Sequence, residues 1–275
     1  MLRNLFCIFV TGVWTVVGFV GTVLAMLFTL NRSASIKVVQ RLWSPVLLWA
    51  GGARLEVQGL EGLDRTQPYV FVSNHQSTID IPTLFMALPW DVRFVSKKAL
   101  MYVPFLGWYM WLAKFIFVDR GNRKTAIASL DKAAQQIRDG ISIIVFAEGT
   151  RSPDRTVKPF KKGPFALAMK AGVPLVPVAI EGSGKLMPKN TWVITPGPIK
   201  VLVGKPIDPK PFGDDREALI ATVRAAIIDQ NVALGGLGGD KKDAVAAQGL
   251  EGIGKAARSR EPQGSSLSPE ASRDP

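Results

Sequence analysis

Two short segments hold the side chains whose chemistry stands out. Residues 74–80 read Asn-His-Gln-Ser-Thr-Ile-Asp, and residues 146–152 read Phe-Ala-Glu-Gly-Thr-Arg-Ser. His75 is the only histidine in the 275 residues, so any reaction that needs an imidazole base near neutral pH must use it. His75 lies five residues before the Asp80 carboxylate and upstream of a cluster of Glu148, Gly149, Thr150 and Arg151. The pattern predicts a base that activates a hydroxyl, with a cationic site for an anionic substrate.

His75 and Asp80 can meet in only one backbone arrangement. Five residues along a helix turn through about 140°, which points two such side chains apart. The pair therefore requires His75 in a loop and Asp80 in the first turn of the following helix. A purely structural interpretation stays open, because Ser77 to Asp80 also match a capping box, in which Asp80 binds only the Ser77 backbone.

A second group of candidates follows other predicted strands. Glycine lets the backbone approach a ligand closely, and arginine presents a planar fork suited to phosphate. Part of this set also has an interpretation without function. Asp119 and Arg120 would then form an exposed surface ion pair, and Lys97 and Lys98 would be two solvated lysines. The candidate residues are Lys97, Lys98, Arg120, Glu148, Gly149, Thr150 and Arg151.

These residues need a scaffold, and the hydrophobic pattern predicts an α/β fold with a central mixed sheet flanked by helices. The predicted strands are Arg54–Val57, Tyr69–Ser73, Arg93–Ser96, Phe115–Val118, Ile141–Phe146, Leu175–Ile180, Val193–Thr195 and Ile199–Val203. The predicted helices are Ile79–Leu88, Arg123–Arg138, Lys161–Ala171 and Asp214–Gln230. The candidate residues follow strand ends, where α/β proteins commonly build sites.

The N-terminal segment predicts a membrane anchor. No residue between Arg3 and Arg32 is charged, and about 20 apolar residues suffice to span a bilayer. Ile36–Ala50 suggests an amphipathic helix at the interface, interrupted at Pro45. Whether the first helix spans the membrane or forms a hairpin stays open. The excess apolar length favours a retained anchor over a cleaved signal peptide, and the basic residues that follow favour a cytoplasmic catalytic domain.

Charge and composition limit the classes of molecule that the protein is expected to bind. The formal net charge is +12, and the chain from Gly235 onward carries equal numbers of basic and acidic residues, so the excess belongs to the preceding body. A basic body seeks phosphates, and the apolar N-terminus favours an anionic membrane surface over nucleic acid. One cysteine and one histidine predict neither a disulfide framework nor a metal site. We expect an anchor at 1–50, an α/β domain at 51–232 and a disordered tail at 233–275.

Four blocks occur in an order that resembles the glycerolipid acyltransferases, and most closely the 1-acylglycerol-3-phosphate acyltransferases. The likeness covers about residues 70–205. Two departures are visible: Ala147 stands where the family usually has proline, and Ala99 stands where many members carry glutamate. The blocks are Asn74-His75-x-Ser77-x-x-Asp80, Phe117-Val118-Asp119-Arg120, Phe146-Ala147-Glu148-Gly149-Thr150-Arg151-Ser152 and Val176-Pro177-Val178-Ala179-Ile180.

The resemblance implies transfer of a fatty acyl group from acyl-CoA or acyl-carrier protein to lysophosphatidic acid, without a bound cofactor or metal. His75 would be the base and Asp80 its partner, as in the acid-imidazole half of a hydrolase triad. Arg120 and residues 148–151, with Lys97 or Lys98, would bind the glycerol phosphate. Pro177 would shape the acyl-donor side. The aromatic run Tyr102–Phe117 is expected either to line an acyl slot, to dip into the bilayer or to form ordinary core.

Three other functions stay open at this stage. An acyltransferase for another glycerolipid or lysophospholipid acceptor fits the same blocks. A non-catalytic lipid-binding protein would need the anchor and the basic face but not His75. A thioesterase or lipase would need a protein nucleophile, and the chain has no Gly-x-Ser-x-Gly elbow while Cys7 lies in the apolar run.

Overall fold

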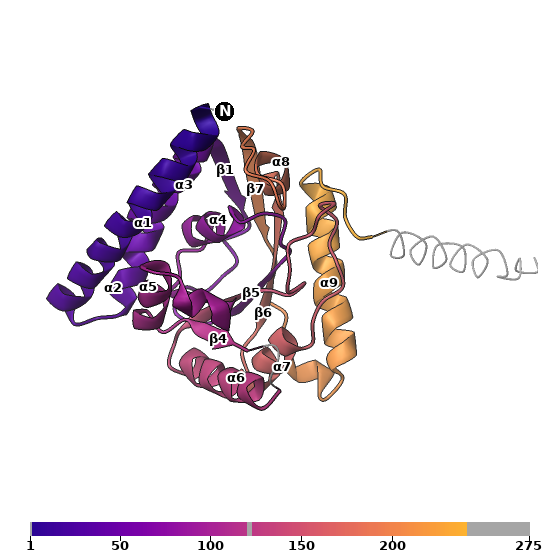
Figure 1. Ribbon diagram of the computed structural model, residues 1–275. Coiled ribbons are helices and arrows are strands. Elements are labelled where there is room, and N and C mark those ends of the chain that lie inside the picture. The colour runs from indigo at the N-terminus through magenta and orange to yellow at the C-terminus, as the bar shows by residue number, and fades with distance from the viewer. Residues whose placement is uncertain (1, 120–122, 241–275) are drawn as a thin grey trace, which may run out of the picture. The chain divides into compact units, whose positions relative to one another are not determined.

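The computed structural model describes residues 2–119 and 123–240, except for the side chains of 123–127. The chain divides into two units, Met1–Gly238 and Gly239–Pro275, and all elements described below lie in the first. Its centre is a seven-stranded sheet of order β1-β7-β6-β2-β5-β3-β4, in which only the β6–β7 pairing is antiparallel (Figure 1). The strands are β1 (Ala53–Gln58), β2 (Val70–Ser73), β3 (Val92–Lys97), β4 (Ile116–Val118), β5 (Ser142–Phe146), β6 (Leu175–Glu181) and β7 (Gly197–Val203).

Helices cover both faces of this sheet, and the pleat supplies each face with apolar side chains. Tyr69 and Phe71 point to the core shared with α3, α4 and α5, whereas Val70 and Val72 point to the core shared with α6, α7 and α9. The fold class predicted from the sequence is therefore confirmed. The helices after the first strand are α4 (Asp80–Ala87), α5 (Leu106–Leu112), α6 (Arg123–Arg138), α7 (Gly163–Ala171), α8 (Ser183–Leu186) and α9 (Arg216–Ala233), with short 3₁₀ turns at Lys98–Tyr102 and Lys210–Phe212.

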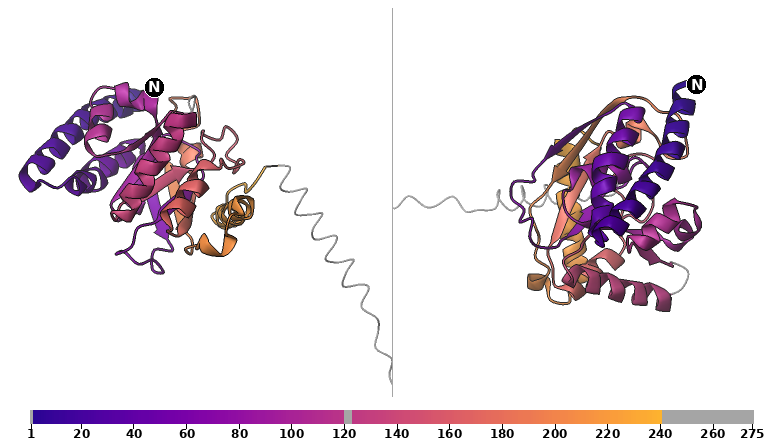
Figure 2. Two further views of the ribbon diagram at one scale, coloured as in Figure 1. Left: turned by 90° about the horizontal axis from the view of Figure 1, so that it is seen from below. Right: turned by 90° about the vertical axis from the view of Figure 1, so that its left-hand side faces the viewer.

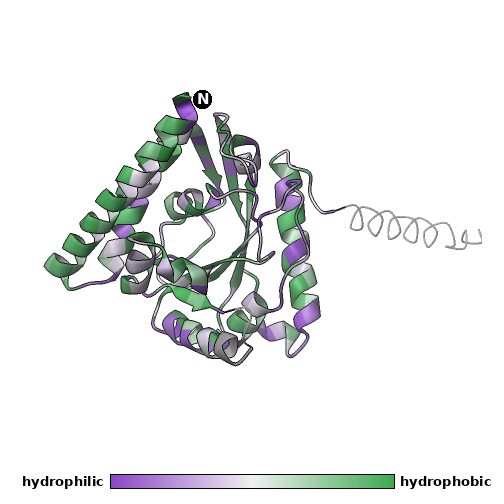
Figure 3. Ribbon diagram, in the orientation of Figure 1, coloured by the Kyte–Doolittle hydropathy of each residue, from purple (hydrophilic) through white to green (hydrophobic). Residues whose placement is uncertain are grey.

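The N-terminal segments form two helical rods that lie side by side (Figure 2). The first is α1 (Leu2–Thr29), which is apolar along most of its length (Figure 3) and, by length and composition, able to cross a membrane. The second comprises α2 (Ser33–Val38), a π-helical turn at Val39–Trp43 and α3 (Ser44–Gly51). Pro45 does not break this rod. It sits at the start of α3, where its missing N–H is tolerated, directly after the π turn.

Two expectations about local structure need correction. Val193–Thr195 is not a strand but part of an irregular loop, in which Ile194 N–H donates to Asn4 Oδ1 of α1 at 3.3 Å. A short apolar run with a β-branched residue does not make a strand when a helix side chain already takes its backbone N–H. The sequence analysis also gave no helix over Leu106–Leu112, where the structure has α5.

Candidate active site

The strand register brings the two notable segments to one edge of the sheet. β2 and β5 are parallel neighbours, and their last residues, Ser73 and Phe146, stand opposite each other. The loops that follow therefore leave the sheet together, as loops after parallel strands do. Asn74 secures this edge on the other side: its side-chain amide donates to Ile180 O of β6 and accepts from Ile180 N, at 2.9 and 2.8 Å.

His75 and Asp80 are in direct contact. His75 lies in the loop and Asp80 is the first residue of α4, which is the one arrangement that lets them meet. His75 Nδ1 is 2.8 Å from Asp80 Oδ2, and the Asp80 side chain is fully buried. The same oxygen accepts the backbone N–H groups of Gln76 and Ser77, each at 2.8 Å. Asp80 therefore holds both the imidazole and the start of the helix.

The backbone of His75 is held on both sides by the neighbouring loop. Its N–H donates to Glu148 Oε1 at 2.9 Å, and its carbonyl accepts the N–H of Ser152 at 2.7 Å. Because these bonds reach from the loop after β5 to the loop after β2, the two sequence segments form one unit.

The imidazole also has an aromatic support that sequence reasoning missed. The Phe146 ring stacks on the His75 ring with centroids 3.8 Å apart and planes at 9°. Phe94 of β3 stacks in turn on Phe146 at 5.5 Å. The signal in the sequence was limited to Phe146 being the last residue of a predicted strand, Ile141–Phe146. What the sequence lacks is the register that places the rings face to face.

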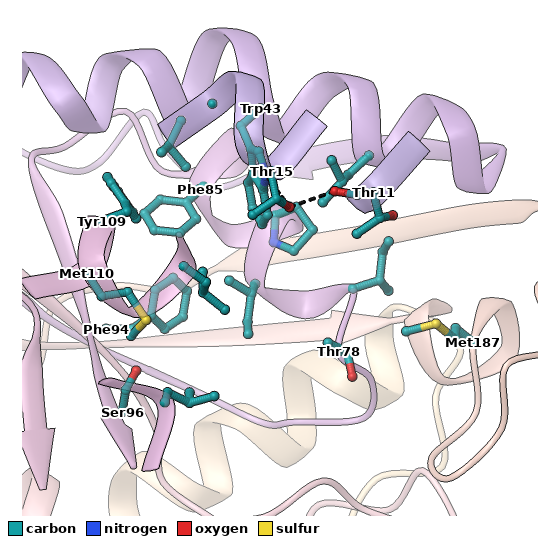
Figure 4. Close-up of a pocket in the computed structure, with 18 of the residues that line it drawn as sticks. Thr11, Thr15, Trp43, Thr78, Phe85, Phe94, Ser96, Tyr109, Met110 and Met187 are labelled. Carbon is teal, nitrogen blue, oxygen red and sulfur yellow. Dashed lines mark hydrogen bonds between the residues drawn. The ribbon is translucent and has the colours of Figure 1, made fainter. Parts of the chain in front are cut away.

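A cavity of about 800 Å³ extends from His75 to the inner side of α1. Figure 4 shows Thr11 and Thr15 of α1 across this cavity from Ser96 of β3. Along α1 the lining residues are mostly small, which leaves room for a ligand. They include Thr11, Gly12, Thr15, Gly18 and Thr22. The remaining wall is largely apolar and includes Phe85, Phe94, Leu106, Tyr109 and Met110.

The cavity is polar and cationic at the His75 end. Gly149, Thr150 and Arg151 line it, with Lys97 and Lys189. Gly149 has φ of 73°, a left-handed conformation that favours glycine and turns the chain sharply after β5. Arg151 Nη1 donates to Thr78 Oγ1 at 2.9 Å.

Lys189 and Thr78 are site residues that sequence reasoning missed. Lys189 Nζ donates to Arg151 O at 2.7 Å, so it joins the cationic group from a distant part of the chain. Nothing in the local pattern around Lys189 marks it. Thr78 sits between the two predicted partners, and only the fold turns its hydroxyl toward Arg151.

Two of the predicted site residues, Lys98 and Pro177, do not line this cavity. Lys98 points elsewhere and pairs with Asp119, Nζ to Oδ2, at 3.5 Å. Pro177 is buried within β6, where its carbonyl accepts the N–H of Gly204. Among the described residues neither lines the cavity. Arg120 lies outside the described residues.

Asp80 and Glu148 are two further predicted residues that do not line the cavity, and the position of Glu148 is informative. Its exposed fraction is 3%, and among the described residues it does not line the cavity. Burial raises the pKa of Glu148 to about 8, with the His75 N–H acting in the opposite direction. The carboxyl group lies beneath the loop that carries His75 and contacts the His75 backbone, while Gly149, Thr150 and Arg151 face the cavity.

The aromatic run Tyr102–Phe117 contains core residues such as Tyr109 and Phe115, and its side chains face two ways. Phe105, Tyr109 and Phe115 line the cavity. Trp108 and Trp111, on the other side of α5, are exposed at 50% and 65%. One helix thus contributes an inner wall and an apolar outer surface.

Comparisons with known proteins show which family the chain is similar to. A family model described as Acyltransferase matches residues 54–181. The 1-acyl-sn-glycerol-3-phosphate acyltransferase of Saccharomyces cerevisiae is 35% identical over 218 residues, covering 77% of this chain and 72% of the yeast protein. The alpha form from Homo sapiens is 34% identical over 200 residues, covering 72% and 71%.

A plant relative and a crystal structure complete the comparison. The chloroplastic 1-acyl-sn-glycerol-3-phosphate acyltransferase of Brassica napus is 34% identical over 234 residues, covering 83% of this chain but 66% of the plant protein. This chain thus spans about two thirds of that relative. The crystal structure of the 1-acyl-sn-glycerophosphate acyltransferase PlsC from Thermotoga maritima has a TM-score of 0.76 and 29% identity, covering 85% of this chain and 95% of that one.

Proposed function

This chain belongs to the acyltransferase family, and we propose that it moves a fatty acyl group from a thioester to the 2-hydroxyl of 1-acylglycerol-3-phosphate, forming phosphatidic acid. The observation that carries the proposal is the 2.8 Å contact between His75 Nδ1 and Asp80 Oδ2, at the cationic end of a largely apolar cavity. A general base, a phosphate site and room for an acyl chain are what this reaction requires.

The hydrogen bond at Nδ1 of His75 decides which nitrogen of the imidazole accepts the proton of the substrate hydroxyl. Asp80 holds Nδ1, so Nε2 is the atom that takes the proton from the substrate hydroxyl. The hydroxyl oxygen attacks the thioester carbonyl, a C–O bond forms and the C–S bond breaks. The imidazolium then returns its proton to the departing thiolate. Asp80 stabilises the imidazolium, and Phe146 keeps the ring in one plane.

The acceptor phosphate binds at Arg151, with Lys97 and Lys189 adding positive charge. Gly149 and Thr150 allow the glycerol backbone to approach closely. Glu148 orients the His75 backbone instead of touching the glycerol, because its carboxyl group accepts the His75 N–H. Arg120 remains a candidate phosphate ligand from its sequence block alone.

The apolar part of the cavity holds an acyl chain. Its walls come from α1, α4, α5 and β3, so they are built from both the α/β domain and the N-terminal helices. With an apolar α1 on its rim, the cavity suits a substrate drawn from a membrane. We place the enzyme at the cytoplasmic membrane with its catalytic domain in the cytoplasm, using acyl-CoA or acyl-carrier protein as the donor. No bound cofactor enters this mechanism.

The test is a reconstituted reaction. Detergent-solubilised protein is supplied with lysophosphatidate and each acyl thioester, and phosphatidate formation is followed for the wild type, His75→Ala and Asp80→Asn. A positioned general base contributes about 100- to 10,000-fold, so His75→Ala should lose at least that much turnover. Unchanged phosphatidate formation in His75→Ala would refute the mechanism, and acylation of a different lysolipid in preference to lysophosphatidate would refute the acceptor.

A further inference from the structure

A second hollow, of about 330 Å³, lies against the other side of the loop that carries His75. Three short stretches of chain lie between this hollow and the large cavity. In each stretch one residue lines the large cavity and the next residue lines the small hollow. His75 lines the large cavity and Gln76 the small one, and the same alternation holds at 151–152 and at 187–188. Lys189 lines both. The small hollow is therefore separated from the proposed base by a single stretch of backbone. The hollow and the large cavity share Lys189 as a lining residue.

The small hollow contains a buried hydrogen-bond acceptor without a partner. Gln76 has an exposed fraction of 1%. Its Nε2 donates to Arg155 O and to Glu181 Oε2, both at 3.2 Å. Its Oε1 has no partner among the described residues. A buried oxygen of this kind destabilises the fold unless a donor reaches it, so the site suits a ligand that carries an N–H group.

A glycine keeps the space beside this oxygen open. A Cβ added at Gly184 would lie 3.1 Å from Gln76 Oε1 and 2.9 Å from Arg155 Cγ. Gly184 lines the hollow and its φ is not positive. The backbone conformation at this position does not require glycine. The absence of a side chain, which leaves space beside Gln76 Oε1, explains the residue instead.

The surrounding charges favour an anion. Lys185 is already paired with Glu181, Nζ to Oε1, at 2.8 Å. Lys189 Nζ meets only a carbonyl, Arg151 O. The Arg155 guanidinium has no hydrogen bond or ion pair with any residue that the structure describes. Two positive charges thus lack a negative partner here, and one is an arginine fork of the kind that binds phosphate.

We propose that this hollow binds the polar arm of the acyl donor, the phosphopantetheine chain that coenzyme A and acyl-carrier protein share. An amide N–H of the arm donates to Gln76 Oε1, and its phosphate binds the Arg155 guanidinium. Lysophosphatidate also has a phosphate, but its one hydroxyl donor is the reacting 2-hydroxyl, which lies at His75 in the proposed mechanism, so it does not match the pair of features. The inference rests on the proposed function, and it brings donor and acceptor to His75 from opposite sides of one loop.

The experiment compares two donors that differ only in the phosphate, acyl-phosphopantetheine and acyl-pantetheine of one chain length, with lysophosphatidate as acceptor. Arg155→Gln should raise the KM for the phosphorylated donor about tenfold or more, the scale of one charge-assisted hydrogen bond, and change the KM for acyl-pantetheine by less than about twofold. Gly184→Ala should raise the KM for both donors, because its methyl group crowds Gln76 Oε1.

Matched controls separate local from general effects. Arg65→Gln removes the same charge from an exposed loop residue, and Gly163→Ala adds a methyl group where nothing lies within 4 Å. Both should leave the two KM values unchanged. The wild-type kcat/KM with acyl-CoA and with acyl-carrier protein identifies the natural source, and Arg155→Gln should raise the KM for that donor.

Two results would overturn the inference. One is an equal effect of Arg155→Gln on both pantetheine donors, and the other is a raised KM for lysophosphatidate in place of the donor. Either outcome, with wild-type protein still forming phosphatidate, leaves the proposed function intact. Absence of phosphatidate from the wild type with every donor would instead refute the function itself.

Discussion

The carboxylate of Asp80 accepts three hydrogen bonds at a single oxygen, one from the imidazole and two from the backbone at the start of α4. The sequence had left two interpretations, a helix cap or a partner for His75, and the structure contains both. The imidazole is therefore bound to a carboxylate that two backbone N–H groups hold in place. The orientation of the proposed base is therefore set before substrate binds.

Glu148 allows a prediction with a pH dependence. Its pKa is raised to about 8 in the folded protein from an ordinary value of 4.5. Between those values the unfolded chain is ionised while the folded protein keeps its proton, so stability falls as pH rises, by up to about 1.4 kcal/mol per pH unit. Thermal unfolding from about pH 5 to pH 8 should show this loss in the wild type and a smaller one in Glu148→Gln.

The same position separates two roles kinetically. Glu148→Gln keeps an oxygen for the His75 N–H and should retain most of its kcat with an unchanged KM for lysophosphatidate. Glu148→Ala leaves that N–H without its acceptor and should lower kcat about tenfold or more. A raised KM for lysophosphatidate in both variants would instead indicate a glycerol ligand.

A further prediction concerns the proposed phosphate site and compares two adjacent lysines, Lys97 and Lys98. Arg151→Gln and Lys97→Gln remove charge from the cavity and should raise the KM for lysophosphatidate, by about 10- to 100-fold for Arg151. Lys98→Gln is the matched control, since Lys98 pairs with Asp119 away from the cavity. With a monoacylglycerol acceptor, which has no phosphate, Arg151→Gln should have little effect. An equal KM change in the Lys98 variant would contradict the assignment.

At the scale of elements, parallel pairing of β2 with β5 explains why two segments distant in sequence form one site. Their loops exchange hydrogen bonds in both directions around His75. The helix α1 is the second essential element, because its small residues form the far wall of the cavity. An N-terminal segment that looks like a simple anchor therefore also forms a wall of the cavity.

This role of α1 predicts a change in chain-length preference. Gly12 lines the cavity, and a Cβ there would meet nothing within 4 Å, so Gly12→Phe should fill part of the acyl space without displacing the helix. Initial rates with thioesters of graded length should then shift toward shorter chains. Val13→Phe, at the next and exposed position, is the control and should leave the preference unchanged. An identical shift in both variants would argue against an acyl slot at α1.

At the scale of the whole described unit, apolar surface gathers on the N-terminal side. Leu5, Phe9 and Val13 of α1 are exposed, as are Trp49 and Trp108 on neighbouring helices. Apolar side chains on this scale normally face another protein or a membrane. Tryptophans at such a surface suit the head-group region of a bilayer.

The resulting prediction concerns fractionation. Washing membranes with high salt or carbonate should leave the protein bound, since the attachment is apolar and not only electrostatic. Replacing Phe9, Val13 and Val20 together by lysine should release it into the soluble fraction. Val232→Lys, an exposed apolar position on α9, is the control and should stay bound. Recovery of the wild type in the soluble wash would refute the anchor.

The sequence by itself determined the fold class, most strand and helix positions, and the identity of His75 and Asp80 as candidate partners. These depend on local information: apolar periodicity, and reactive residues directly after buried strands. Even the condition for the pair, a loop histidine and a first-turn aspartate, follows from helix geometry. Arg151 was recognisable for the same reason.

Only the tertiary structure decided which way the neighbouring side chains face. Glu148 turns beneath the loop while Gly149 to Arg151 face the cavity, and Lys189 arrives from a segment without any local signal. The cavity itself exists only because α1 packs against helices far along the chain. Side-chain direction in a loop depends on its exact turn and on strand register, and long-range packing depends on contacts between distant residues. Neither is encoded in the spacing of residues along one segment.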